Sequence, residues 1–220
     1  MQITIDDMLK GLCPEIRLGV ISYNARVCEK CDDLWLFMQQ NTLKTVRGRL
    51  ADAPVSEYAN IAEARAAYRA FGQDPTRYRV SSEALLRRIG QGKPLYQINS
   101  IVDTCNMISL ESGFSVGSYD ESRITGNVEL RLGRRDESYE GIGRGTVKVE
   151  RLPLLADPAS PFGGTTCDSI RAMITPGDKS ITTVIYSFSA NNDLEIYLLK
   201  ALGWLEKFAG AKDLKSNIVE

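Results

Sequence analysis

Segments with helical periodicity and segments with strand periodicity follow one another in an irregular order along these 220 residues. Strand-type patterns, rich in β-branched residues or alternating apolar with polar residues, occupy 15–26, 127–133, 146–152 and 181–188. Helical spacing of apolar residues occupies 32–50, 56–72, 81–90, 100–112 and 192–209. Because regular strand–helix–strand alternation is missing, the sequence predicts an α+β, or irregular α/β, architecture.

Local signals place the ends of several predicted helices. Ser56 and Ser81 are typical N-cap residues, and Gly72 and Gly113 are typical residues for a helix C-terminus. The turn signal over 72–76 is the best candidate boundary, which divides the chain into residues 1–72 and 73–220. No long linker separates the two portions, so we expect them to pack as one compact unit.

The composition excludes several kinds of catalysis. The chain has no His, which rules out Ser-His-Asp triads, Cys-His pairs and zinc sites with His ligands. Any catalysis must therefore use carboxylates, amides, hydroxyls, backbone N–H groups or the substrate's own groups. The 27 basic and 28 acidic residues give a net charge of −1, so no global positive field attracts nucleic acid or membranes.

The five Cys residues are an odd number and scattered, which favours reduced thiols over a disulfide framework. Cys28 and Cys31 have CxxC spacing, which is compatible with a redox pair, half of a zinc site, or two ordinary thiols. Since no second ligand pair is evident, we expect no metal and no cofactor. The first residues lack the order of a signal peptide and no apolar run approaches ~18 residues, so we expect a cytoplasmic protein without membrane contact.

Glycine-rich segments do not indicate a nucleotide site. Gly141-Ile-Gly143-Arg-Gly145 resembles part of a phosphate loop, but it joins strand-like runs and does not open a helix. A hairpin turn is the better interpretation. No Gly-Lys-Ser or Gly-Lys-Thr occurs, so we do not expect hydrolysis of nucleoside triphosphates.

The predicted helix over 100–112 carries the clearest candidate site. Asn99, Asp103 and Asn106 are spaced i, i+4 and i+7, so they share a face largely opposite the apolar stripe. Short Asn and Asp side chains lower helix propensity, which favours fixed hydrogen-bonding roles for them. Two roles stay open: these side chains tie down the preceding loop and the turn at Gly113, or they contact a ligand.

Two further groups of residues are weaker candidates. Paired glycines and hydroxyls in the predicted loop over 163–166 can bring a ligand close to backbone N–H groups. The alternative is an ordinary loop, as for the turn predicted at 119–120. Basic residues in the middle of the chain can form a nucleic-acid surface only if folding separates them from the neighbouring acids, and a solvated surface is the alternative; the candidates are Arg77, Arg87, Arg131 and Arg135.

A family resemblance joins these segments. The order of Arg77-Tyr-Arg-Val-Ser-Ser-Glu-Ala-Leu-Leu-Arg-Arg88, Ile98-Asn-Ser-Ile-Val-Asp-Thr-Cys-Asn-Met-Ile-Ser-Leu110 and Val116-Gly-Ser-Tyr-Asp120 resembles the B3/B4 domain of the phenylalanyl-tRNA synthetase beta chain. The likeness is greater to small freestanding bacterial proteins built around that domain. It covers roughly residues 77–190 and includes Asp168-Ser-Ile-Arg171.

The resemblance implies a mixed sheet flanked by helices, and a module that binds tRNA-related ligands and hydrolyses wrongly esterified Tyr-tRNA. It implies no aminoacylation by this chain. Under this mapping the ligand-binding candidates are Asn99, Asp103, Asn106, Gly117, Asp120, Gly164, Thr165, Asp168 and Arg171, the last six in loops facing a pocket. No catalytic residue is assigned. The alternatives are an amino-acid or small-metabolite binding module, and a scaffold domain.

Overall fold

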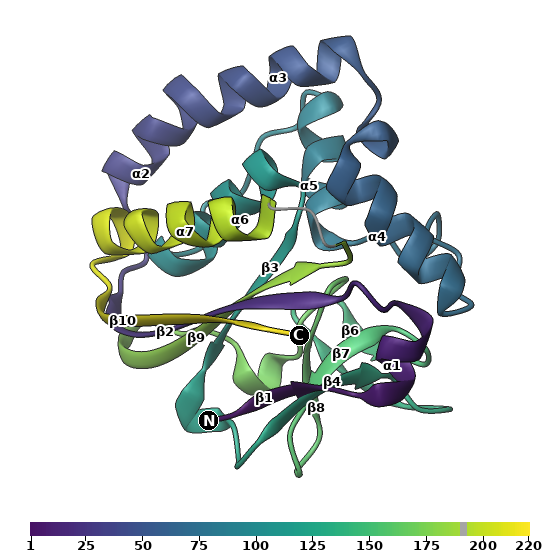
Figure 1. The fold of residues 1–220 in the computed structure, drawn as a ribbon. Coiled ribbons are helices and arrows are strands. Elements are labelled where there is room, and N and C mark those ends of the chain that lie inside the picture. Colours follow the sequence, from purple (N-terminus) through teal and green to yellow (C-terminus); the bar gives the residue numbers. More distant parts are fainter. Residues whose placement is uncertain (190–192) are drawn as a thin grey trace.

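The computed structural model describes residues 1–189 and 193–220, and it confirms the α+β prediction (Figure 1). The strands are β1 Ile3–Ile5, β2 Arg17–Val27, β3 Ser115–Asp120, β4 Val128–Leu132, β5 Ser138–Gly141, β6 Gly145–Lys148, β7 Pro153–Ala156, β8 Pro161–Gly164, β9 Gly177–Ser187 and β10 Lys212–Val219. The helices are α1 Asp7–Leu12, α2 Asp32–Phe37, α3 Leu43–Asp52, α4 Ala59–Ala70, α5 Ser81–Gly90, α6 Ser100–Ser112 and α7 Asp193–Ala209.

Two sheets of four strands and one hairpin make up the β structure. The sheet with the longer strands, called the larger sheet here, has the order β10-β2-β9-β3 and is antiparallel throughout. The smaller sheet has the order β1-β4-β7-β8, with β1 parallel to β4 and the other pairs antiparallel. Residues 1–72 contribute β2 to the first sheet and β1 to the second. The two portions of the chain therefore share both sheets.

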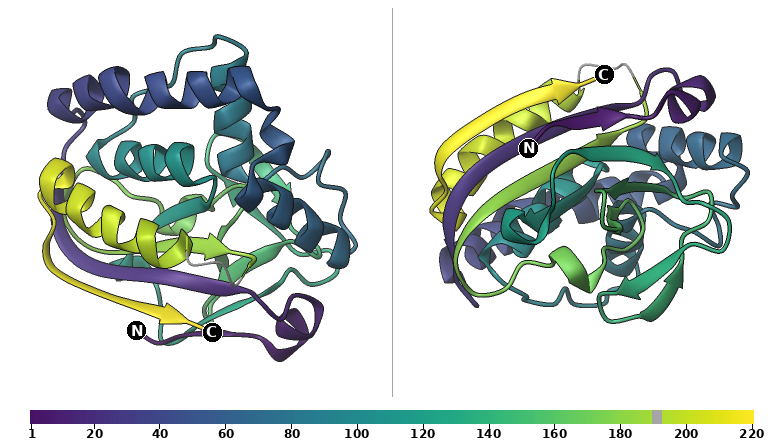
Figure 2. Two further views of the ribbon diagram at one scale, coloured as in Figure 1. Left: turned by 45° about the horizontal axis from the view of Figure 1, so that its top comes forward. Right: turned by 90° about the horizontal axis from the view of Figure 1, so that it is seen from below.

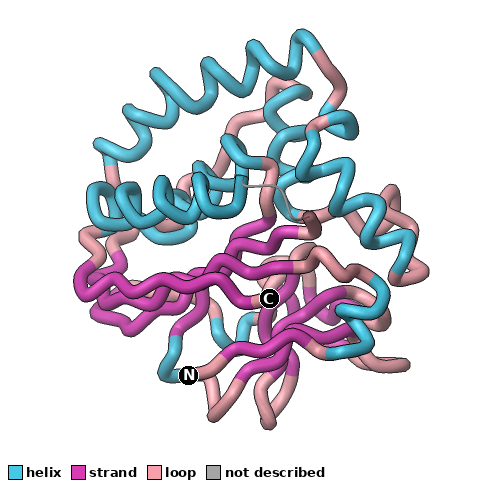
Figure 3. The backbone as a smooth tube through the Cα atoms, in the orientation of Figure 1, coloured by secondary structure: helices cyan, strands magenta, loops and turns pink. Residues whose placement is uncertain are grey.

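Helices α6 and α7 lie against one face of the larger sheet, and the smaller sheet lies beyond its other face (Figures 1, 2 and 3). The alternation along β2 and β9 matches this layering. Ile21 and Ile185 pack in the core formed with α6 and α7, whereas Val20 and Val184 pack in a second core shared with the smaller sheet. Burial on both faces over 181–187 explains why this part of β9 is a nearly continuous apolar run without alternation, whereas its first four residues alternate between intermediate and exposed.

Several predicted helix boundaries hold and others do not. Helix α6 spans Ser100–Ser112 and ends at Gly113, whose φ of 80° is the left-handed conformation expected at this position. The caps predicted at Ser56 and Ser81 are wrong. A 3₁₀ turn over 55–57 precedes α4, and α5 begins at Ser81 after Val80, with no side-chain cap at either start. The predicted start of the last helix at Asn192 lies outside the described residues.

The predicted helix over 32–50 contains a π-helical irregularity that its sequence pattern does not predict. Helices α2 and α3 are joined by a π-helical segment, Met38–Thr42, so that the helical path continues across the outer side of the molecule (Figure 1). Apolar residues from both sides of this segment, such as Leu34 and Val46, are fully buried. The helix is therefore held by packing along its whole length.

The predicted positions of three candidate residues need correction. Gly117 and Asp120 lie in β3 and Gly164 lies at the end of β8, whereas the resemblance implied loops. Their strands are short and rich in Gly and Ser, so neither alternation nor β-propensity marks them clearly. The predicted strand over 146–152 is also too long, because β6 ends at Lys148 and the chain turns at Arg151, which has a φ of 57°.

Tyr119 joins β3 to β8 through an unusually close approach of its ring to glycine backbone. A Cβ placed on Gly117 would lie 2.2 Å from the Tyr119 hydroxyl, and one on Gly163 would lie 2.4 Å from it. The Phe162 ring packs edge-on against Tyr119, with ring centroids 5.1 Å apart. At Gly163 the room that glycine leaves is therefore taken by Tyr119, so the paired glycines do not both face a ligand.

We predict that Gly117→Ala destabilises the fold by about 1–3 kcal/mol, because the added methyl group forces Tyr119 out of its position. Gly48→Ala is the matched control, since nothing lies within 4 Å of its added Cβ on α3. That change should stabilise the protein by about 0.5–1 kcal/mol through helix propensity. Urea unfolding of both variants measures the difference, and equal stability of the two would contradict the packing described.

Candidate functional site

A cavity of about 320 Å³ lies between α5, α6, β3 and the segment that follows β8. Its walls are mainly apolar, and its volume is at the low end of the range found for small-molecule sites. The apolar lining consists of Leu85, Ile98, Val102, Val116, Ile142, Met173 and Ile174. The remaining lining residues are Ser81, Asn99, Cys105, Asn106, Ser109, Gly117, Ser118, Gly164, Cys167 and Asp168.

Asp168 is the carboxylate of this cavity. Its Oδ1 accepts hydrogen bonds from the Tyr119 hydroxyl and from the backbone N–H of Gly164, both at 2.9 Å. Burial raises the pKa of Asp168 to about 6, and these two hydrogen bonds oppose that rise. The group is thus an acid that changes charge close to neutral pH while its position is fixed by two donors.

Tyrosine hydroxyls extend the polar network behind Asp168. Tyr119 also contacts the Tyr186 hydroxyl at 2.8 Å, and burial holds the pKa of both phenols well above the ordinary value. Burial likewise raises the pKa of Cys105, to about 12, and that of Cys167. These tyrosines therefore remain hydrogen-bond donors, and neither cavity thiol has the depressed pKa of a nucleophilic cysteine.

Of the three residues predicted on one face of α6, two reach the cavity. Asn106 lines it, and within the described residues its side-chain amide has no hydrogen-bond partner, so it can bind a ligand. Asn99 lines it too, but its Oδ1 caps α6 by accepting from the backbone N–H groups of Ile101 and Val102. Asn99 therefore supports the site mainly by fixing the start of the helix.

Asp103 is buried outside the cavity lining. Its carboxylate accepts from the backbone N–H of Ile98 at 3.0 Å and from the indole N–H of Trp35 at 2.9 Å. Desolvation raises its pKa although both donors act in the opposite direction. The structure thus favours the tying role for Asp103, which fixes the loop before α6 and joins it to α2.

A basic recess of about 510 Å³ adjoins the cavity and shares Ser81, Leu85 and Asn106 with it. Its cationic lining residues are Arg79, Arg87, Arg88, Lys93 and Arg144, and no carboxylate lines it. Within the part of the chain that the structure describes, no acidic side chain forms an ion pair with Arg79, Lys93 or Arg144. The recess also presents an aromatic ring, because Arg88 lies 4.2 Å over exposed Tyr96.

The four arginines predicted to contact nucleic acid do not come together. Only Arg87 lines the recess, where it pairs with buried Glu83 at 2.8 Å. Arg131 forms a two-pronged pair with Glu137 in another hollow that several acids line. Arg135 lies fully exposed beside Asp136, and Arg77 lies over the Tyr78 ring. The four residues selected from the sequence leave out Arg79, Arg88, Lys93 and Arg144, of which Arg144 reaches the recess only through the β5–β6 turn.

The other predicted ligand-binding residues have structural partners. The Thr165 hydroxyl meets the Tyr68 hydroxyl at 2.5 Å, and its carbonyl accepts from the backbone N–H of Ser81. Asp120 accepts from Lys179 at 2.7 Å, and Arg171 pairs with Asp157 at 3.0 Å. None of these three residues lines the cavity, whereas Gly117, Gly164 and Asp168 do.

The predicted hairpin turn over 141–145 is confirmed, since it joins β5 to β6. The turn closes one wall of the cavity, because the backbone N–H of Ile142 donates to the Asp168 carbonyl at 2.9 Å. A residue that sequence reasoning assigned to an ordinary turn, Ile142, therefore belongs to the candidate site.

Cys28 and Cys31 are both free thiols, near the start of α2. Cys28 is exposed, and the Cys31 thiol lies 3.3 Å from the Phe208 carbonyl. Among the described residues, no group of three or more His, Cys, Asp or Glu side chains is placed to hold a metal ion. No helix in the same part of the chain is long and apolar enough to cross a bilayer.

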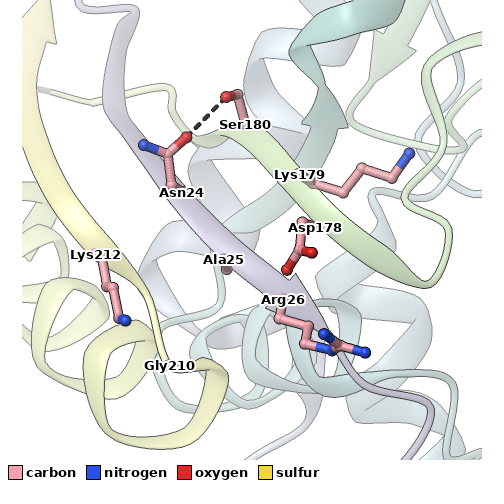
Figure 4. A pocket seen from close by; sticks show the side chains of 8 residues that line it. All are labelled: Asn24, Ala25, Arg26, Asp178, Lys179, Ser180, Gly210 and Lys212. Atoms are coloured by element: carbon pink, nitrogen blue, oxygen red, sulfur yellow. Dashed lines mark hydrogen bonds between the residues drawn. The ribbon is translucent and has the colours of Figure 1, made fainter.

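A separate hollow, of about 550 Å³, lies at the far end of β2 and β9 (Figure 4). It is lined by charges of both signs, including Arg26, Asp178 and Lys212, and Ser180 donates to Asn24 across it at 2.7 Å. It contains none of the candidate residues and is more open than the cavity beside α6. We therefore place the candidate site at the cavity and the basic recess.

The family model of the B3/4 domain matches residues 63–190 of this chain, which is more than half of it. The chain belongs to the B3/4 domain family. Every residue that lines the cavity or the recess lies within the matched range. The match thus confirms the resemblance found in the sequence and shows that the candidate site is part of the B3/4 domain.

Among solved structures, the chain is similar to an N-terminal fragment of the phenylalanyl-tRNA synthetase beta subunit from Pyrococcus horikoshii, with a TM-score of 0.45 and 13% identity. The alignment covers 99% of this chain and 50% of that one, so this chain spans about half the length of that fragment. No curated protein matches the chain.

We predict that Asp103→Ala lowers the free energy of unfolding by about 1–3 kcal/mol, because the buried donors of Ile98 and Trp35 lose their acceptor. Asp103→Asn keeps one acceptor oxygen and should lose less. Chemical denaturation measures both. Unchanged stability with reduced ligand binding would instead assign Asp103 a direct contact with the ligand.

We predict that Asp168→Asn stabilises the fold at pH 7.5. Between about pH 4 and pH 6 the folded state retains a proton that the unfolded chain has lost, so wild-type stability falls as pH rises through this window. One pKa unit corresponds to ~1.4 kcal/mol, which gives a gain of about 2–3 kcal/mol at pH 7.5 and little gain near pH 3.5. Thermal unfolding at both pH values tests this, with exposed Asp136→Asn as the control. A gain that is the same at both pH values would argue against it.

Proposed function

We propose that this protein binds the aminoacylated 3′ end of a tRNA and hydrolyses the ester that joins the amino acid to the terminal ribose. The observation that carries the proposal is that the apolar cavity lies directly beside the basic recess. The two share Ser81, Leu85 and Asn106 as lining residues. An aminoacyl-tRNA has the matching parts, namely an amino-acid side chain next to a chain of phosphates. Membership of the B3/4 family supports the same assignment.

The basic recess suits the RNA part of such a ligand. Cations that lack acidic partners bind phosphates without first breaking an ion pair. Arg79 and Arg144 reach the recess from different elements, one from the segment before α5 and one from the β5–β6 turn. Exposed Tyr96 beside Arg88 offers a ring on which an unpaired base can stack. The recess thus provides charge and stacking despite the net charge of −1 of the whole chain.

The cavity suits the aminoacyl part. In hydrolysis, water forms a bond to the ester carbonyl carbon, the bond from that carbon to the ribose oxygen breaks, and this oxygen takes up a proton. Fixed polar groups can accelerate the step by orienting the ester and the water without a strong base. The Asn106 amide and the Ser118 hydroxyl are groups of this kind in the cavity, so the lack of His is no obstacle.

The alternative is a module that binds an amino acid or a small metabolite without RNA. The enclosed shape and the mainly apolar walls of the cavity favour it, because they would serve a free small ligand equally well. A panel of free amino acids in a thermal-shift assay separates the two, since a ligand at 100-fold over its dissociation constant adds about 2.7 kcal/mol of stability.

We predict that Arg79→Ala combined with Arg144→Ala weakens tRNA binding by roughly tenfold at low salt and makes the dependence of affinity on salt shallower by about one to two released ions. Arg26→Ala, in the hollow at the far end of the sheet, is the matched control and should bind tRNA normally. Filter binding over a salt series measures this, and the release of amino acid from mischarged Tyr-tRNA measures hydrolysis. A wild-type protein that neither binds tRNA at low salt nor accelerates the release over buffer would disprove the proposed function.

A further inference from the structure

We infer that the Asp168 carboxylate binds a protonated amino group, so that the cavity selects ligands in which a primary ammonium is joined to an apolar body. The inference deepens the proposed function. It rests on that function only where it names the aminoacyl end of a tRNA as a source of the ammonium group.

The carboxylate has a free side. The two donors to Asp168, the Tyr119 hydroxyl and the Gly164 N–H, bind the same oxygen, Oδ1. Among the described residues no group donates to Oδ2, and no Lys or Arg forms an ion pair with Asp168. Oδ2 is not among the fully buried polar atoms that lack a hydrogen-bond partner, so it is accessible to a small group, and Asp168 lines the cavity.

An ionised carboxylate in such surroundings is costly unless a cation meets it. Buried charges in proteins are as a rule paired, and the Coulomb energy between opposite charges is larger in an apolar cavity than in water. Of the four carboxylates that are fully buried in the described residues, Glu83, Asp120 and Asp157 each have an Arg or Lys, and Asp103 has two neutral donors at its own oxygens. Asp168 stands apart from them because the space where a cation would lie is the cavity itself.

The walls define the rest of the ligand. Apolar side chains such as Leu85, Val102 and Ile174 surround the space in front of Asp168, so a ligand gains most when its ammonium is joined to an apolar body. A ligand that carries its own carboxylate places a second negative charge in the same low-dielectric space. The cavity should therefore favour amines and aminoacyl esters over free amino acids.

This charge preference separates the substrate from the product of the proposed reaction. An aminoacyl ester has an ammonium and no carboxylate, whereas hydrolysis releases a free amino acid with a carboxylate next to Asp168. Repulsion between the two carboxylates weakens the binding of the product relative to that of the ester. Asp168 would thus hold the ester and promote release of the amino acid.

The binding of amine should strengthen as pH rises from about 5 to about 7, because Asp168 must lose its proton first. The other titratable groups that act on Asp168 or lie beside it are the phenols of Tyr119, Tyr139 and Tyr186 and the thiols of Cys105 and Cys167. Each of them has a raised pKa, so they all stay neutral over this range and leave Asp168 to set the pH dependence.

The test uses two small probes of nearly equal size in titration calorimetry with the full chain. We expect 2-phenylethylamine to bind at least tenfold more tightly than neutral 2-phenylethanol at pH 7.5, and phenylacetate to bind most weakly. Asp168→Asn should remove the preference for the amine, while Asp136→Asn should keep it. A neutral probe that binds wild type as tightly as the amine, an amine that binds the Asn variant as tightly as wild type, or the absence of amine binding would each overturn the inference.

A second measurement identifies the source of the amino group. N-acetylation of the aminoacyl group removes its charge and should slow hydrolysis of the aminoacyl-tRNA at least tenfold at low substrate concentration. If the ester is hydrolysed equally fast with and without acetylation, the proposed function stands and the inference fails. If free amines bind as expected and no aminoacyl-tRNA is bound or hydrolysed, the ammonium site stands and the proposed function fails.

Discussion

The pairing of β2 with β9 is the constraint on which the rest of the structure depends. These two strands pair along eleven residues of each, from Arg17 with Ser187 to Val27 with Gly177, and both lie inside the larger sheet. Because 18–21 of β2 and 181–187 of β9 are buried on both faces, the pair supports the layer of α6 and α7 on one side and the core of the smaller sheet on the other. A strand from the first 30 residues and one from beyond residue 170 must meet before either core can close.

The candidate site is built on the edge of this frame. Strand β3 pairs with β9 and brings Tyr119 beside Tyr186 and Asp168, while α6 packs next to β3 and presents Asn106. The glycines at 117 and 163 belong to the frame more than to the ligand, since they make room for the Tyr119 ring. Through that ring the sheet fixes the position of the one carboxylate that lines the cavity.

The sequence predicted those parts of the fold in which a strong local pattern coincides with the packing. Helix α6 has an Asn cap, an apolar stripe and a terminal Gly, and its predicted range is the observed one. Strands β7 and β8 have four residues each, and β10 is largely exposed at a sheet edge, so none of them has a pattern that periodicity can detect. The π-helical segment and the shared sheets depend on tertiary packing, which no local pattern encodes.

The candidate site was predicted in part for the same reason. Asn106 was found from its spacing on the predicted helix and Asp168 from the family resemblance, and the structure places both in one cavity. Arg131 was selected by its charge alone, but its guanidinium forms an ion pair with Glu137. Among the described residues, no acid forms an ion pair with Arg79 or Arg144, which both line the recess. Whether a cation is free depends on which acids the fold brings near it, and those acids are distant in the sequence or on another face.

The negative and positive charges of the candidate site lie in different parts of it, so the site has an electrostatic polarity. One half-buried acid, Asp168, lines the apolar cavity, and five cations line the recess that adjoins it, although the chain as a whole is nearly neutral. Such a field favours a molecule that is positive at one end and negative along the rest, and it disfavours the reverse orientation. An aminoacyl end with its ammonium in the cavity and its phosphates in the recess has this polarity, whereas a free amino acid has its two charges too close together to use both regions. For the proposed ligand, the charge pattern by itself favours one orientation, and this preference needs no catalytic side chain of extreme pKa.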